Sequence, residues 1–203
     1  IYPRGFCKGV HHAIQLAKQA RIDHPDKPIS ILGELVHNKD VSQALVELHI
    51  KTIETKGKKR IDLLDEIDEG LVIFSAHGIS SIVQDKAIKK GLTPLNASCE
   101  DVLVTQNQIK AYLQQDYDVL YVGQKGHPEA EAVLDLDPNR IRLVETHLPI
   151  PDINTDRLFV TNQTTMSILD IKATLDAIRS RYPFAVISDE TCAATRLRQE
   201  AIL

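Results

Sequence analysis

The sequence is poor in cysteine, has no surplus of basic residues and lacks long apolar runs. Its three cysteines cannot all pair, which argues against a disulfide framework and favours metal or redox chemistry. The 24 Lys and Arg residues are outnumbered by 28 Asp and Glu, so the usual charge signature of nucleic-acid binding is missing. No apolar stretch approaches the roughly 20 residues of a membrane span, and the start lacks the apolar core of a secretory signal. We therefore expect a cytoplasmic globular protein with neither a nucleic-acid nor a membrane partner.

What the sequence does contain is an internal repeat. The cysteines are separated by 92 (99 − 7) and 93 (192 − 99) residues, a nearly fixed period. Within this period, an apolar stretch ends at Gly33 and again at Gly123, and a histidine follows four positions later in both copies, at His37 and His127. The sequence therefore predicts two related units.

The repeat alternates short apolar strands with helical patterns. We expect helices over 11–22, 39–48, 80–90, 101–115, 129–136 and 166–181. Such alternation predicts an α/β fold, a pseudo-symmetric repeat of small parallel-sheet domains around a central cluster cavity. We expect the first unit over 1–98, the second over 99–191, and the start of a third, missing unit over 192–203. The charged segment 54–70 is expected to form a connection and helix with a solvated face, and 144–157 a surface loop.

The cysteines are the first candidate ligands. Cys7 lies where a strand runs into a helix, and the helix N-terminus favours an anionic thiolate. Equivalent positions in a repeat approach a common axis, so Cys99 and Cys192 are expected beside it. Three thiolates suit an iron–sulfur cluster with one iron that has no protein ligand, or zinc with an open fourth position. The absence of Cys-x-x-Cys pairs favours the cluster, and three unrelated buried cysteines are the remaining alternative.

Three histidines and one glutamate are the candidate substrate groups. His37, His77 and His127 each follow an apolar strand, and carboxyl ends of parallel strands are where α/β sheets bind ligands. We expect them to line one cavity and to donate hydrogen bonds to an anion. Glu129, on the first turn of the next helix, is a candidate proton donor or relay. The other histidines are interpreted as ordinary polar residues: His11, His12, His24, His49 and His147.

Six motifs in order carry a family resemblance: PRGFCKGV, VHN, FSAHGIS, GHPE, QTT and CAATRLRQEA. Together they resemble the 4-hydroxy-3-methylbut-2-enyl diphosphate reductase family of the non-mevalonate isoprenoid pathway, over nearly the whole chain. The resemblance implies three α/β domains around a [4Fe–4S] cluster. It implies the following roles: cluster ligands Cys7, Cys99 and Cys192; diphosphate-binding histidines His37, His77 and His127; proton-delivering Glu129; and the relay hydroxyl of Thr164, which also contacts substrate.

The implied reaction removes the allylic hydroxyl of the substrate with two electrons and two protons, giving isopentenyl and dimethylallyl diphosphates. A small ferredoxin or flavodoxin is the implied electron donor. The pattern departs from the family after Cys99, where a usual proline is absent, and at Leu197, where an asparagine is usual. Only 11 (203 − 192) residues follow Cys192. The alternatives are a truncated or degenerate homologue that binds a cluster or metal without catalysis, and a zinc hydrolase that uses the Cys/His set.

Overall fold

The computed structural model describes residues 2, 4–55 and 57–202, and the chain divides into two compact units. The first unit is Phe6–Glu100, and the second combines Ile1–Gly5 with Asp101–Leu203. Among the described residues, each unit contains one four-stranded sheet whose strands are all parallel. Parallel strands need long crossover connections, and the helices between them provide these.

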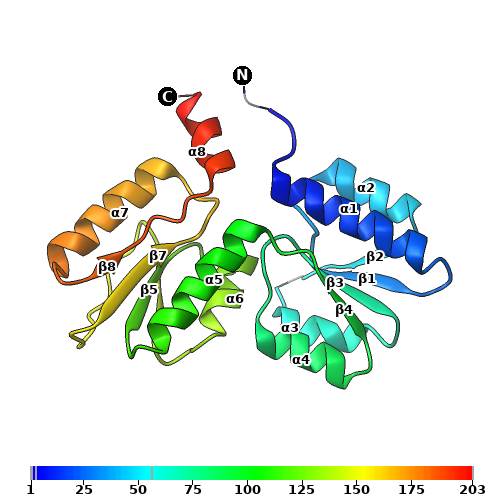
Figure 1. Cartoon of the computed structure of the whole chain (residues 1–203), viewed down its shortest axis with the longest axis horizontal. Coiled ribbons are helices and arrows are strands. Elements are labelled where there is room, and N and C mark those ends of the chain that lie inside the picture. The colour runs from blue at the N-terminus through cyan, green and yellow to red at the C-terminus, as the bar shows by residue number, and fades with distance from the viewer. Residues whose placement is uncertain (1, 3, 56, 203) are drawn as a thin grey trace. The chain divides into compact units, whose positions relative to one another are not determined.

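The first unit has the strand order β2-β1-β3-β4. Its two central strands read ISIL and LVIF and are buried along their whole length, as expected of a parallel sheet covered on both faces. Figure 1 shows helices α1 and α2 over one face and α3 and α4 over the other. The elements are α1 (Lys8–Asp23), β1 (Ile29–Leu32), α2 (Lys39–Glu47), β2 (Ile50–Ile53), α3 (Arg60–Leu63), the 3-10 helix η1 (Leu64–Glu66), β3 (Leu71–Phe74), α4 (Ser81–Lys89) and β4 (Thr93–Asn96).

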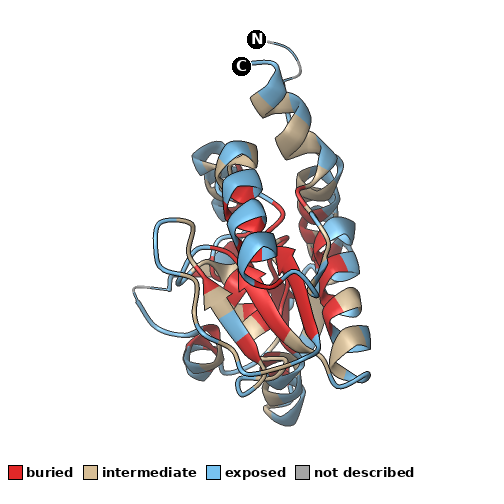
Figure 2. Ribbon diagram, turned by 90° about the vertical axis from the view of Figure 1, so that its left-hand side faces the viewer, coloured by how far each residue is buried: buried red, intermediate tan, exposed pale blue. Residues whose placement is uncertain are grey.

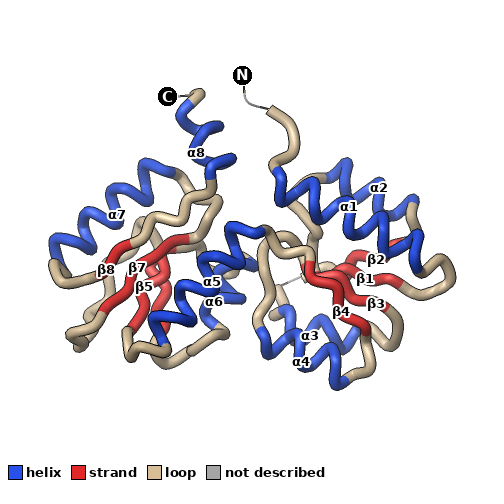
Figure 3. Tube along the Cα trace, viewed as in Figure 1, coloured by secondary structure: helices blue, strands red, loops and turns tan. Residues whose placement is uncertain are grey.

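The second unit has the order β6-β5-β7-β8. Helices α5 and α6 pack on one face of this sheet and α7 on the other, which Figure 3 shows as blue helices on either side of red strands. Figure 2 shows its strands buried between helices with exposed outer faces. The elements are α5 (Glu100–Leu113), β5 (Asp118–Val122), α6 (Pro128–Leu134), β6 (Ile141–Val144), β7 (Leu158–Asn162), α7 (Ile168–Arg181), β8 (Val186–Ile187) and α8 (Ala193–Glu200).

The two sheets repeat one topology. Strands β1 to β4 correspond in order to β5 to β8, so the loop after β1 is equivalent to the loop after β5. The predicted α/β fold with parallel sheets is confirmed, as are the six predicted helices, whose bounds shift by at most three residues. Within the described part of the chain, no helix has the length and apolar character to cross a membrane.

The expected solvated face over 54–70 is wrong for the inner side of that segment, of which residue 56 lies outside the described residues. Leu63, Leu64 and Ile67 are buried against the first sheet because their spacing places them on one side of α3 and η1. Arg60 is also buried, with only 2% of its surface exposed. Its guanidinium donates hydrogen bonds to the carbonyl of Gly78 and the hydroxyl of Ser75, which offset part of its desolvation.

Candidate active site

Two histidines meet at the carboxyl edge of the first sheet. His37 follows β1 and His77 follows the neighbouring strand β3, so parallel pairing brings their loops together. Their ring centroids are 4.4 Å apart, with the planes tilted by 35°. The Nδ1 of His37 lies 2.8 Å from Oε2 of Glu34, and because a carboxylate only accepts, Nδ1 carries the hydrogen. This edge therefore presents two adjacent imidazoles, which suits the binding of an anion.

A buried arginine orients His77. Arg60 donates to Oγ of Ser75 at 3.0 Å, and that Oγ lies 3.2 Å from Nδ1 of His77. The serine oxygen accepts from the guanidinium and can exchange a further hydrogen bond with Nδ1, which ties the His77 ring to Arg60. Arg60 also fixes the turn after His77 through the carbonyl of Gly78, at 2.6 Å. The sequence reasoning missed Arg60 and Ser75, because a basic run normally indicates a solvated surface.

Two cysteines lie close together in the first unit. The Sγ of Cys7 caps α1 by accepting the N–H of Val10 at 3.5 Å. Cys99 directly precedes α5, and its N–H donates to the carbonyl of Ala76 at 2.9 Å. A Cβ at Gly9, on the first turn of α1, would lie 2.6 Å from Sγ of Cys99. Only glycine at this position lets the Cys99 thiol approach the start of the Cys7 helix.

Glu129 lies buried at the carboxyl edge of the second sheet, with 1% of its surface exposed. Helix α6 carries it, and Thr164 lies beside it, two residues after the end of β7. The N–H of Thr164 donates to Oε1 at 2.9 Å, and the Thr164 hydroxyl donates to Oε2 at 3.1 Å. The phenol of Tyr121, on β5, donates to Oε1 at 3.2 Å. The contact between Glu129 and Thr164 unites two residues chosen from the sequence, which had no signal for Tyr121 because it reads as an apolar strand residue.

Burial gives Glu129 a near-neutral pKa. Loss of solvation raises the pKa of this carboxyl from 4.5 to about 7, although the hydrogen bonds from Thr164 and Tyr121 favour the charged form and lower it. The nearby charge of Asp101, on α5, raises it further. A carboxyl that titrates near pH 7 can both hold and release a proton under neutral conditions, as a general acid requires.

His127 fixes the start of helix α6. Its Nδ1 accepts the N–H of Glu129 at 3.1 Å, so this ring carries its hydrogen on Nε2 unless it is protonated. Gly126 precedes it with φ of +78°, a left-handed conformation that favours glycine. The turn and the cap together set the directions in which His127 and Glu129 leave the helix.

Cys192 is joined to the Glu129 network through one residue. Its N–H donates to the carbonyl of Thr164 at 3.0 Å, and its Sγ lies 3.1 Å from Oγ1 of Thr195. The preceding loop is held by Asn162, which donates to Oγ1 of Thr191 at 3.1 Å and accepts the N–H of Glu190 at 3.0 Å. Thr164 thus contacts both a predicted ligand and the predicted acid.

The donor set fits an iron–sulfur cluster. Each cysteine directly precedes a helix, where backbone N–H groups and the positive end of the helix dipole suit an anionic ligand group. All three are only partly buried, and among the described residues none is paired in a disulfide. Gly9 has no side chain that would occupy the space beside the Cys99 thiol.

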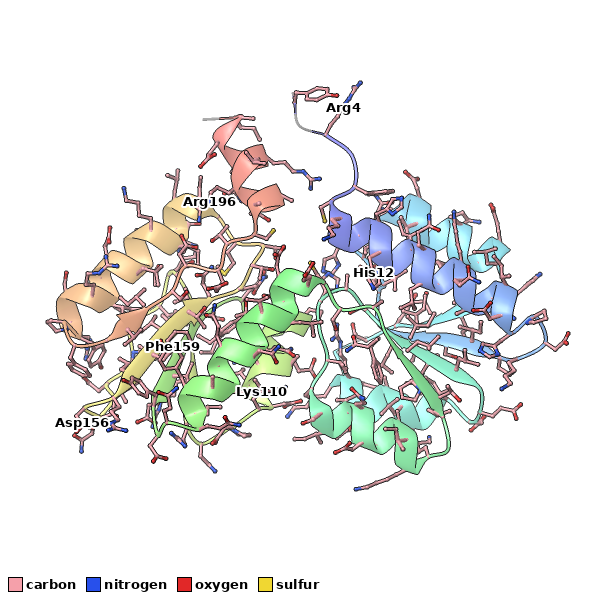
Figure 4. All side chains as sticks on the ribbon, viewed as in Figure 1. Arg4, His12, Lys110, Asp156, Phe159 and Arg196 are labelled. Carbon is pink, nitrogen blue, oxygen red and sulfur yellow. The ribbon has the colours of Figure 1, made fainter. Side chains whose placement is uncertain are left out.

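The histidines interpreted as ordinary polar residues include His12, which lies exposed on α1 and is labelled in Figure 4.

The fold and the site define the class: an α/β protein of repeated four-stranded parallel sheets, with thiols at helix starts and a buried acid. A family model described as LytB protein matches residues 1–203, and the chain belongs to that family. Two curated relatives carry the name 4-hydroxy-3-methylbut-2-enyl diphosphate reductase. The one from an Exiguobacterium species is 45% identical across 100% of this chain and 65% of its own length, and the one from Geobacillus kaustophilus is 43% identical across 100% and 64%.

Solved structures agree with this relationship. The E-1-hydroxy-2-methyl-but-2-enyl-4-diphosphate reductase of Plasmodium falciparum superposes with a TM-score of 0.85 and 30% identity, covering 99% of this chain and 62% of the other. A second structure, of (E)-4-hydroxy-3-methyl-but-2-enyl diphosphate reductase, superposes with a TM-score of 0.78 and 26% identity, covering 98% of this chain and 69% of the other. The family inferred from the motifs is confirmed. The chain spans somewhat less than two thirds of the curated relatives' length.

Proposed function

We propose that this chain supplies two units of a reductase that converts 4-hydroxy-3-methylbut-2-enyl diphosphate to isopentenyl and dimethylallyl diphosphates. The observation that carries the proposal is the buried Glu129, which shares Thr164 with Cys192 and titrates at a pKa of about 7. The family and the names of its relatives support the same reaction. The proposal includes a cytoplasmic location and a small ferredoxin or flavodoxin as electron donor.

In this proposal, Cys7, Cys99 and Cys192 hold one [4Fe–4S] cluster through their thiolates. When bound, the cluster supplies single electrons and a Lewis-acidic iron for the substrate's hydroxyl oxygen. The chain's contribution is to keep three thiolates available at helix N-termini, where negative charge is stabilised. Gly9 keeps space open for the thiol of Cys99.

The histidines bind the diphosphate group. His77 lies with its Nδ1 beside the Ser75 hydroxyl, and His37 lies with its Nδ1 hydrogen-bonded to Glu34, so both rings are held in fixed orientations for the anion. His127 donates from Nε2 because its Nδ1 caps α6. Hydrogen bonds to an anion are stronger than those between neutral groups, so these rings contribute mainly to affinity.

Glu129 and Thr164 deliver protons. The allylic C–O bond breaks, and two electrons arrive from the external donor. One proton converts the leaving hydroxyl to water and a second is added to the allyl carbon skeleton, which gives the two isomeric products. Glu129 holds the proton at its carboxyl, and the Thr164 hydroxyl, 3.1 Å from Oε2, passes it on.

The test is anaerobic purification followed by metal analysis and an assay with a strong artificial reductant. The proposal requires iron and sulfide bound to protein, a broad absorption band at the edge of the visible range, and formation of both products. A colourless protein with stoichiometric zinc would support a zinc hydrolase instead. A brown protein that binds substrate yet forms no product would support a non-catalytic homologue.

A further inference from the structure

Tyr121 is a buried phenol that the reaction described above leaves without a role. Its side chain lies on the α5/α6 face of the second sheet, among Val119, Phe159 and Ile109, and none of its surface is exposed. Figure 4 labels Phe159, which marks the strand β7 beside it. A phenol inside an apolar core needs a hydrogen-bond partner, and here the partner is Oε1 of Glu129 at 3.2 Å.

The three hydrogen bonds at Glu129 are divided unequally between its oxygens. Among the described residues, Oε1 accepts two, from the Thr164 N–H and the Tyr121 hydroxyl, whereas Oε2 accepts one, from the Thr164 hydroxyl. A carboxylate oxygen has two in-plane lone pairs, so Oε1 is filled and the acidic proton is directed to Oε2. Oε2 is the oxygen that faces Oγ1 of Thr164.

We infer that Tyr121 is a positioning residue that fixes the acidic proton of Glu129 on Oε2, next to the Thr164 hydroxyl. The inference rests on the proposed function of Glu129 as the proton donor. Tyr121 itself touches neither substrate nor cluster in this account, and it acts by occupying the second lone pair of Oε1. The protonated carboxyl therefore releases its proton from Oε2, toward the Thr164 hydroxyl.

The surroundings hold Tyr121 in this role. A Cβ at Gly123 would lie 2.9 Å from Cε1 of the tyrosine ring, so the backbone packs directly against it. Burial and the adjacent Glu129 raise the pKa of Tyr121 well above its usual value, which keeps the phenol protonated as a donor. The other titratable groups that face Glu129 are Asp101 of α5, which raises its pKa, and His127, whose Nδ1 accepts its N–H.

Replacing Tyr121 with phenylalanine should change the pKa of Glu129 in a defined direction. Loss of a donor to the charged form raises the pKa of Glu129, by about one pH unit if the bond has the usual strength of one made to a charged group. The substitution also frees one lone pair of Oε1, so that the acidic proton can bind there instead of at Oε2. The matched control is Tyr112→Phe. Tyr112 packs on the same core, with its ring centroid 3.9 Å from that of Phe159, and within the described part of the chain the hydrogen bonds to the Glu129 carboxyl come from Thr164 and Tyr121.

The experiment is an infrared pH titration of the protonated carboxyl stretch, with Glu129→Gln subtracted to isolate Glu129. In Tyr121→Phe we expect the midpoint to rise by about one pH unit and the stretch to split or shift, because hydrogen bonding at the carbonyl oxygen changes. Tyr112→Phe keeps the wild-type midpoint. In the assay, the alkaline limb of the kcat profile moves to higher pH in Tyr121→Phe, while KM is unchanged. An unchanged midpoint in Tyr121→Phe overturns the inference.

A second measurement covers the case in which Tyr121→Phe does not fold. Global 3-fluorotyrosine labelling of the five tyrosines makes the phenols stronger donors and should lower the Glu129 midpoint, opposite to the phenylalanine variant. No movement would overturn the inference. Should these midpoints move while Glu129→Gln retains full turnover, the proposed acid role fails and the contact is structural. Should Glu129→Gln lose turnover while the midpoints stay fixed, the Tyr121 inference alone fails.

Discussion

The carboxyl ends of the two sheets share a topology but differ in burial. In the first unit, the loops after β1 and β3 present His37 and His77, which are exposed and half-buried, respectively. In the second unit, the equivalent loops after β5 and β7 place Glu129 and Thr164 in the interior, with 1% and 2% of their surfaces exposed. One scaffold thus supports two environments at the same edge of its sheet.

This difference in burial assigns different chemistry to the two ends. Imidazoles that are exposed or half-buried keep ring N–H groups that can reach an anion. A carboxyl in the interior loses solvation, and its pKa rises to about 7, so it keeps a proton at neutral pH. The comparison supports the proposal that both units contribute histidines to bind charge, and that the second unit adds a buried carboxyl that holds a proton.

The largest effect is expected from Glu129→Gln. The amide keeps the shape and can still accept from Thr164 and Tyr121, but it has no acidic proton. We expect kcat to fall by about 10²- to 10⁴-fold, the usual contribution of a general acid, with KM and the cluster spectrum unchanged. Steady-state kinetics under anaerobic conditions check this, and Glu131→Gln, on the same helix, is the control. Wild-type kcat in Glu129→Gln would contradict the acid role.

Glu129 also makes stability depend on pH. Its folded pKa of about 7 exceeds the ordinary glutamate value of 4.5, so the folded state binds more protons between these two pH values. Stability therefore falls as pH rises from about 4.5 to 7, by an amount on the order of 3 kcal/mol from this group. Chemical denaturation across this range should show the slope in wild type and its loss in Glu129→Gln. The same dependence of unfolding free energy on pH in the two proteins would mean that the Glu129 carboxyl is not protonated in the folded state.

Two variants of Thr164 distinguish the role of its hydroxyl from that of its backbone N–H. Thr164→Val keeps the N–H bond to Oε1 and the side-chain shape but removes the bond to Oε2. We expect kcat to fall by about 10- to 100-fold and the pKa of Glu129 to rise, since a donor to the charged form is lost. Thr164→Ser should retain most activity. Equal kcat values for the valine and serine variants would remove the hydroxyl from the relay.

The smallest effect is expected at the cysteine pair of the first unit. Alanine normally stabilises a helix relative to glycine by about 1 kcal/mol, but a Cβ at Gly9 would lie 2.6 Å from the Cys99 Sγ. We expect Gly9→Ala to lower iron bound per chain by about twofold without unfolding the protein, as the thiol is displaced. Gln15→Ala, on the exposed side of α1, is the control. Full iron content in Gly9→Ala would show that the thiol can move without cost.

Much of the architecture could be predicted because it depends on local patterns. Apolar strands such as ISIL and LVIF alternate with helical segments, and the repeat in glycine and histidine spacing matches the repeat in strand order. Glu129 is predicted from its position on the first turn of the helix after a strand, and Thr164 from the family resemblance, and the fold brings the two into contact. Those residues are polar at strand ends, which is a visible signal in a sequence.

The missed residues act through long-range packing that no local pattern records. Arg60 lies in a basic run and yet is buried, because its guanidinium meets Ser75 and the Gly78 carbonyl across the unit. Tyr121 resembles any core residue of a strand until α6 places a carboxyl against its hydroxyl. In both cases the partner lies eight or more residues away, and only the fold brings the two groups together.

The most direct test of the comparison is the affinity of the cluster-loaded protein for its diphosphate substrate, measured anaerobically by calorimetry for wild type, His37→Gln and Glu129→Gln. If the histidines bind charge and the buried carboxyl of the second unit holds a proton, His37→Gln loses about 10- to 100-fold in affinity, the strength of one hydrogen bond to a charged group. Glu129→Gln stays within about twofold of wild type, because its hydrogen-bonding shape is retained. Wild-type affinity in His37→Gln, or a large loss in Glu129→Gln, would contradict the division of roles between the histidines and the carboxyl.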